Sequence, residues 1–197
     1  MPKQIIVIQG GTTYYTYEQY IDALKTKELT IEKLLTTDWK FSLQVKLGPD
    51  YQILLPRMPN SNNAKFQEWE IWFSKLIPLL EDDIALIGHS LGGIFLAKYL
   101  SEHKLKTPVN KLMLVAAPSY DDPELVDFQF KDGFESIKSN CKQIYLIYSR
   151  DDPVVQFNAH DQYKIKLPDS KSLTFRDRQH FNQSEFPELL ELLKNNS

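Results

Sequence analysis

Residues 84–100 read IALIGHSLGGIFLAKYL, and this stretch decides the fold class. Ile84–Ile87 is a short apolar run typical of a buried strand, whereas Leu91–Glu102 has apolar residues at helical spacing. Three of the seven glycines of the chain stand at this junction, where they permit a tight turn. The stretch therefore predicts a buried strand that turns sharply into a helix, as in the repeating unit of an α/β fold.

The same alternation of apolar run and helical pattern extends over the chain. Further strands are expected at Ile5–Ile8, Tyr51–Leu55, Lys111–Ala116, Gln143–Tyr148 and Ser172–Phe175. Helices are expected at Trp39–Leu47, Ala64–Leu80, Phe134–Cys141, Val155–Lys164 and Phe186–Lys194. Because most of the strands lack polar alternation, both faces of the sheet should be buried. We predict an α/β fold over residues 1–197, a single domain with an about six-stranded, mostly parallel sheet and helices on both of its faces.

Composition excludes several classes of protein. The 197 residues are 42% hydrophobic and 25% charged with a net charge of −3, so neither disorder nor a nucleic-acid partner is expected. The apolar runs are far shorter than a membrane span, which needs about 20 residues. The run at Ile5–Ile8 is too short for a signal-peptide core, and Cys141 has no second cysteine with which to form a disulfide. These features predict a cytoplasmic protein without a membrane partner.

An extra segment, residues 12–38, separates the first strand from its crossover helix. It contains four tyrosines, and Tyr17–Leu24 and Ile31–Leu35 could each form a short helix. Extra packing at the edge of the sheet is the simpler interpretation. The alternative is a flap over a site beside the first strand, because loops at the carboxyl ends of strands carry function in this architecture.

The pattern Gly88-x-Ser90-x-Gly92 is typical of a nucleophile elbow, a turn that lifts a serine hydroxyl above the sheet. Ser90 would stand at the N-terminus of a helix, where free backbone N–H groups favour a developing negative charge. An ordinary serine in a tight glycine-rich turn is the alternative. The dinucleotide pattern G-x-G-x-x-G and the phosphate-binding pattern G-x-x-x-x-G-K-[ST] are both absent from the sequence.

A nucleophilic serine needs a base, and the histidines of the chain are His89, His103, His160 and His180. His89 is expected to point away from the Ser90 hydroxyl, and His103 closes the helix after the elbow. His160 falls within an expected helix, where capping or packing is the simpler role. His180 follows the last strand, which is where the chain order serine, acid, histidine places the base.

The orienting acid should follow the strand Gln143–Tyr148, where Asp151 and Asp152 stand side by side. Asp152 is favoured because Pro153 sets the turn after it, and Asp151 remains the alternative. The backbone N–H of Leu91 is one expected oxyanion-hole donor. The second donor should come from the loop after the first strand, with Gly11 preferred and Thr12 as the alternative.

These residues resemble the α/β-hydrolase superfamily and, more narrowly, the small serine hydrolases grouped as the retinoblastoma-binding-protein/YdeN family. The matching motifs are Ile87-Gly88-His89-Ser90, Ile137-Lys138-Ser139-Asn140-Cys141, Asp151-Asp152-Pro153 and His180-Phe181 running into Glu185-Phe186-x-Glu188-Leu189. The resemblance implies a compact six-stranded fold with a catalytic triad of Ser90, Asp152 and His180. The family loop often has glycine before the histidine, whereas this chain has Gln179, and residues 12–38 are longer than the usual connection.

The resulting hypothesis is a serine hydrolase that cleaves a small acyl ester, thioester or amide through an acyl-enzyme, with no cofactor and no metal. The alternative is a hydrolase-fold protein that acts mainly by binding a partner, with an idle triad. Tyr120, Phe128 and Phe130 in the span 118–133 either line the site or pack in the core.

Overall fold

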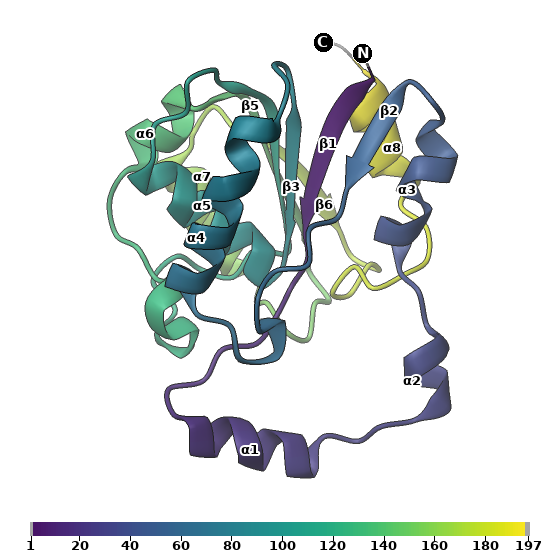
Figure 1. The fold of residues 1–197 in the computed structure, drawn as a ribbon, viewed down its shortest axis with the longest axis vertical. Coiled ribbons are helices and arrows are strands. Elements are labelled where there is room, and N and C mark those ends of the chain that lie inside the picture. The colour runs from purple at the N-terminus through teal and green to yellow at the C-terminus, as the bar shows by residue number, and fades with distance from the viewer. Residues whose placement is uncertain (1, 196–197) are drawn as a thin grey trace.

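The computed structural model describes residues 2–195. It has three layers, with a sheet between two layers of helices (Figure 1). Within these residues a six-stranded sheet has the order β2-β1-β3-β4-β5-β6, and every neighbouring pair is parallel. The strands are β1 Lys3–Ile8, β2 Tyr51–Leu54, β3 Ala85–His89, β4 Val109–Val115, β5 Cys141–Ser149 and β6 Lys171–Phe175. The predicted α/β class is confirmed, and the sheet is parallel throughout.

The helices cover both faces of the sheet, with α3 and α8 on one face and α4 to α7 on the other (Figure 1). Their bounds are α1 Tyr17–Thr26, α2 Ile31–Leu35, α3 Trp39–Leu47, α4 Phe66–Leu76, α5 Leu91–Glu102, α6 Phe134–Ser139, α7 Asn158–Lys166 and α8 Pro187–Lys194. Short 3-10 turns occupy Ser61–Asn63, Ile77–Leu79 and Pro123–Phe128. Within the described residues no helix is long and apolar enough to cross a membrane.

Consecutive strand residues enter two different apolar clusters. Ile6 and Ile8 of β1 pack with α4 and α5, whereas Ile5 and Val7 pack with α3 and α8. Successive side chains of a strand point to opposite faces, so an unbroken apolar run is buried on both. Phe128 and Phe130 belong to the cluster formed with α4 and α5. These two rings therefore pack in the core and do not line the site.

Helices α4 and α7 differ most from the sequence pattern, each for a local reason. The expected helix Ala64–Leu80 is α4 only as far as Leu76, because Pro78 lies in a 3-10 turn that follows. The expected helix Val155–Lys164 starts late, at Asn158. The backbone N–H groups of Val154 and Val155 donate instead to the Asp152 carboxylate, at 2.8 and 2.9 Å.

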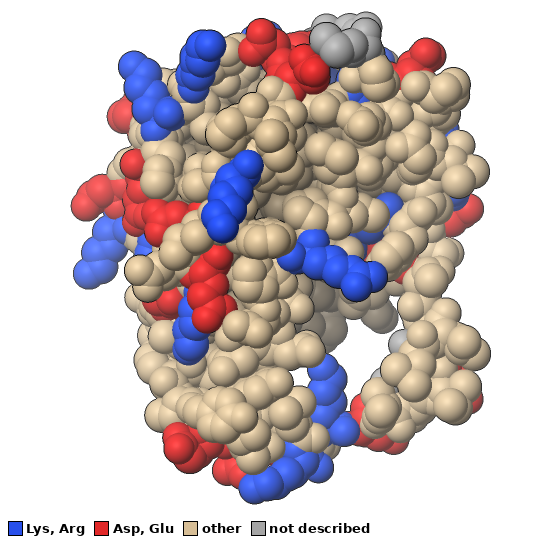
Figure 2. Space-filling model, viewed as in Figure 1, with Lys and Arg blue, Asp and Glu red and all other residues tan. Residues whose placement is uncertain are grey.

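Residues 12–38, which we call the strap, carry α1 and α2 and stand away from the sheet (Figure 1). Figure 2 shows an opening between the strap and the rest of the molecule. None of the described side chains of the strap is buried, which argues against its interpretation as packing at the sheet edge. The start of the strap is tied down, since Thr13 Oγ1 donates to the Ala64 carbonyl at 3.0 Å and Lys65 Nζ donates to the Tyr14 carbonyl at 2.7 Å.

Candidate active site

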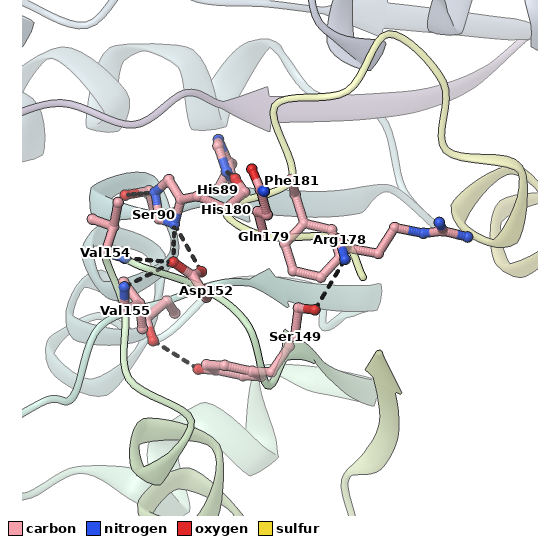
Figure 3. Close-up of polar contacts among 12 residues, drawn as sticks. His89, Ser90, Ser149, Asp152, Val154, Val155, Arg178, Gln179, His180 and Phe181 are labelled. Atoms are coloured by element: carbon pink, nitrogen blue, oxygen red, sulfur yellow. Dashed lines mark hydrogen bonds and ion pairs between the residues drawn. The ribbon is translucent and has the colours of Figure 1, made fainter. Parts of the chain in front are cut away.

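The candidate site lies at the carboxyl edge of the sheet. Ser90 follows β3, Asp152 lies in the loop after β5 and His180 lies in the loop after β6. Because the strands are parallel, their carboxyl ends share one edge, and residues 90 apart in the sequence meet there. Figure 3 shows the His180 ring between Ser90 and Asp152, with dashed lines to both.

Ser90 has the strained backbone of an elbow, with φ 55° and ψ −125°. Its N–H donates to the Val115 carbonyl of the neighbouring strand at 2.9 Å, which holds the turn against β4. The turn also depends on close backbone approach. A Cβ atom built on Gly88 would lie 2.4 Å from the Gly92 carbonyl oxygen, so no larger residue fits at Gly88 without movement. The glycine spacing seen in the sequence is therefore a steric requirement of this turn.

His180 joins Ser90 to Asp152 through both of its ring nitrogens. Nε2 lies 2.9 Å from Ser90 Oγ, while Nδ1 lies 2.8 Å from Asp152 Oδ2 and 3.1 Å from Oδ1. A carboxylate only accepts, so Nδ1 carries the proton and Nε2 is free to accept the hydroxyl proton of Ser90. The Asp152 side chain is 2% exposed and that of His180 is 11% exposed, so little water competes for these hydrogen bonds.

The two neighbouring aspartates have different partners. Asp152 faces His180 and also accepts from the N–H groups of Val154 and Val155 through Oδ1. Asp151 instead accepts from the Ser149 hydroxyl and from the Gln179 N–H, the latter at 3.0 Å. The hydrogen bond from Ser149 lowers the pKa of the Asp151 carboxyl. The geometry thus brings Asp152 to the imidazole and places Asp151 against the backbone of the loop that carries His180.

That loop is strained on both sides of His180. Gln179 has φ 45° and Phe181 has φ 54°, the left-handed region that glycine tolerates best. Gln179 therefore adopts a backbone conformation that would suit glycine better. The loop is fixed by Phe181, which is fully buried against Phe175 and Phe186.

The other three histidines have structural partners. His103 Nε2 lies 2.8 Å from Glu70 Oε1, and the ring stacks on Tyr99. His160 is buried in α7, and its Nε2 lies 2.9 Å from Ser172 Oγ. His89 Nε2 lies 2.8 Å from the backbone carbonyl oxygen of His180, away from the Ser90 hydroxyl as expected.

A cleft of about 460 Å³ opens in front of Ser90. Gly11 and Leu91, the two expected oxyanion-hole residues, both line it. The N–H of Thr12, the alternative donor, is taken by the Ser61 carbonyl at 2.8 Å, which favours Gly11. The remaining lining residues are mostly apolar or acidic, and they are Thr13, Tyr14, Tyr15, Gln19, Pro118, Asp122, Glu124, Leu125, Val154 and Val155.

One group of possible metal ligands occurs within residues 2–195, formed by Glu70 in the middle of α4 and by Glu102 and His103 at the end of α5. Their ligand atoms lie within 4.8 Å of one another. Glu70 already pairs with His103, and Lys98 Nζ lies 3.8 Å from Glu102 Oε1. Glu70 and Glu102 therefore each have a side-chain partner already, and the group contains none of the residues around Ser90.

Comparison with known proteins gives the family. A family model described as "Serine hydrolase" matches residues 36–194. The chain belongs to this serine hydrolase family. It is 31% identical to "Serine hydrolase RBBP9" of Rattus norvegicus over an alignment of 157 residues that covers 74% of this chain and 78% of that protein. The identification from the sequence motifs is thereby confirmed.

Solved structures agree on the α/β-hydrolase fold. The ydeN gene product of B. subtilis superimposes with a TM-score of 0.76 at 21% identity, covering 97% of this chain and 96% of that one. A putative YdeN-like hydrolase from Pectobacterium atrosepticum has a TM-score of 0.64 at 15% identity, covering 97% and 89%. The coverage of 97% extends the likeness in fold to most of the chain.

Proposed function

We propose that this serine hydrolase cleaves a small acyl ester, thioester or amide, using Ser90 as nucleophile, His180 as general base and Asp152 as orienting acid. One observation carries the proposal: the continuous hydrogen-bonded series from Ser90 Oγ through His180 to the buried Asp152 carboxylate, with contacts of 2.9 and 2.8 Å. In a solvated loop histidine, water would be the usual partner of the ring nitrogens, whereas here both nitrogens contact protein side chains.

The reaction follows from the assigned protonation state. Ser90 Oγ attacks the acyl carbonyl carbon while His180 Nε2 takes the hydroxyl proton, and Asp152 stabilises the imidazolium that forms. The Gly11 and Leu91 N–H groups stabilise the oxyanion. The tetrahedral intermediate collapses as His180 returns the proton to the leaving group, which departs as alcohol, thiol or amine. Water, deprotonated by His180, then attacks the acyl-enzyme and releases the carboxylic acid together with free Ser90.

The cleft supports a small acyl group. At about 460 Å³ it falls within the usual range for small-molecule sites, roughly 300–1,000 Å³. Leu91, Val154 and Val155 supply apolar walls next to Ser90, whereas Tyr14 and Tyr15 lie where the strap begins. A short acyl chain could contact these walls on one side of the scissile carbonyl, and the leaving group would extend toward solvent.

A fluorophosphonate probe tests the proposal, because it forms a covalent adduct only with an activated serine. We expect a single adduct on the wild-type protein by intact mass and none on Ser90→Ala. Ser139→Ala, which removes an exposed serine hydroxyl of α6 outside the cleft, is the matched control and should label like wild type. If the Ser90→Ala variant kept labelling or kept full hydrolysis of short acyl esters, Ser90 would not be the nucleophile.

A second candidate function, binding of a partner protein, rests on the strap. Its large apolar side chains are exposed rather than packed, including Leu24, Leu29, Ile31, Leu34 and Leu35. Exposed apolar groups close together are typical of interaction sites. Replacing Leu34 and Leu35 by Ser, with labelling of Ser90 as the control, would separate the roles. Loss of partner capture with unchanged labelling supports binding, and unchanged capture argues against it.

A further inference from the structure

Two buried polar residues beside the site have no part in the proposed chemistry. Lys40, in the first turn of α3, is 3% exposed, and His89, the residue before Ser90, is 4% exposed. Lysine and histidine are seldom buried this completely without partners, because removing a polar group from water is costly. Their contacts therefore indicate what they do.

The two side chains form a series that ends at the backbone of the candidate base. Lys40 Nζ lies 3.3 Å from His89 Nδ1, and His89 Nε2 lies 2.8 Å from the carbonyl oxygen of His180. At its other side Lys40 Nζ pairs with Asp38 Oδ2 at 2.5 Å. Figure 3 shows His89 beside the loop that carries His180.

The direction of these hydrogen bonds fixes the tautomer of His89. An ammonium group only donates, so Nδ1 of His89 must accept, and the ring proton must be on Nε2. That proton points at the His180 carbonyl, which only accepts. Burial, followed by the charges of Lys40 and His180, lowers the pKa of His89 well below its usual value and keeps the ring neutral.

The carbonyl that receives this bond belongs to the strained loop. His180 stands between two residues with positive φ, so its backbone conformation must be maintained by the surroundings. The start of α3 supplies that support from one side. Trp39 Nε1 donates to the Phe181 carbonyl and Trp39 N donates to the Gln183 carbonyl, both at 2.9 Å, while Lys40 acts through His89.

We propose that Lys40 and His89 are positioning residues, a buried relay that holds the His180 backbone so that its imidazole reaches both Ser90 and Asp152. The inference rests on the proposed function of this site. It predicts that the loss of either residue lowers the rate of the chemical steps more than it affects substrate binding. Neither side chain contacts the reacting atoms.

The variants separate positioning from packing. Lys40→Met keeps most of the side-chain volume and removes the donor to His89 Nδ1, so the His89 ring is held through Nε2 alone. His89→Leu removes the donor to His180. His89→Gln retains an amide N–H for the His180 carbonyl and an amide oxygen for Lys40. Lys46→Met is the matched control, because it removes the same charge from the same helix, where Lys46 pairs with the exposed Glu185 at 2.6 Å and lies away from His89.

The assay measures kcat and KM for p-nitrophenyl acetate, the rate of fluorophosphonate labelling and the far-downfield proton NMR signal of the His180 Nδ1–H. For Lys40→Met and His89→Leu we expect kcat about tenfold lower with KM changed less than about threefold, because misplaced catalytic groups slow the chemistry. The downfield signal should weaken in both. His89→Gln should recover most of kcat, and Lys46→Met should match wild type.

The outcomes distinguish the two levels of the proposal. Wild type that neither labels nor hydrolyses the ester refutes the proposed function, and the relay with it. Wild type that labels, with Lys40→Met and His89→Leu at wild-type kcat, refutes the relay alone. Thermal unfolding identifies a variant that fails to fold. If Lys40→Met does not fold, the two His89 variants decide, since recovery of kcat in His89→Gln beside a low kcat in His89→Leu supports the relay and equal loss in both refutes it. If His89→Leu does not fold, a lowered kcat in Lys40→Met supports the relay and a wild-type kcat refutes it.

Discussion

Asp152→Asn is the substitution for which the structure gives the most definite expectation. Oδ1 of Asp152 accepts from the N–H groups of Val154 and Val155, and Oδ2 lies 2.8 Å from His180 Nδ1. In an asparagine, the two backbone donors select the amide oxygen for the Oδ1 position. The amide NH₂ must then take the Oδ2 position and face Nδ1.

This exchange reverses the tautomer of His180. An NH₂ group facing Nδ1 requires Nδ1 to accept, which moves the ring proton to Nε2, where it faces Ser90 Oγ. A protonated Nε2 has no lone pair for the serine proton. The corresponding loss of tautomer in serine proteases costs about 10⁴-fold in kcat, so we expect a fall of about 10³- to 10⁴-fold, or about 4–5.5 kcal/mol in the barrier.

The assay is kcat for p-nitrophenyl acetate near neutral pH, with Asp151→Asn as the matched control. Asp151 contacts the loop backbone and not the imidazole, so its asparagine variant should lose much less activity. The reasoning is refuted if Asp152→Asn retains more than about a tenth of kcat, a loss of less than about 1.4 kcal/mol. Equal losses in both variants would also refute it.

Three further predictions concern stability and reactivity. Gln179→Gly should raise the unfolding free energy by about 0.5–1 kcal/mol in urea titrations, because glycine relieves the positive φ, and a lower unfolding free energy would contradict this. Burial raises the pKa of Cys141 to about 12, so iodoacetamide should leave the native thiol unmodified and label it only after denaturation; rapid native labelling would contradict its burial. His89 has a lowered pKa in the fold, so the unfolded chain alone binds a proton below about pH 6.5 and stability should fall there, by up to about 1.4 kcal/mol per pH unit. Urea titrations across pH should show a weaker dependence for His89→Gln, and an equal dependence would argue against a buried neutral ring.

The parts of the fold that the sequence predicts well are those with local causes. The bounds of α3 and α5 match the expected ones, because Asp38 caps α3, Gly48 ends it with φ 81°, and the elbow starts α5 abruptly. Ser90, Asp152 and His180 all follow strands of a parallel sheet. Their meeting at its carboxyl edge is therefore also predictable from chain order.

Other features depend on contacts between distant residues and leave no local pattern. Lys40 and His89 are 49 residues apart, and nothing in either neighbourhood predicts that they meet. The strap shows a further limit of prediction from sequence. Its periodicity predicts the two short helices, whereas its separation from the sheet depends on tertiary structure.

The strap is also a place where the chain could be cut without separating the strands of the sheet. Because β1 lies between β2 and β3 in the sheet, the residues before the strap are held by strand pairing on both sides. A peptide bond broken between α1 and α2 would leave two fragments that both contribute side chains to the two hydrophobic clusters. The connection therefore offers a place at which a protease could nick the chain, or a second domain could be inserted, with the sheet still complete.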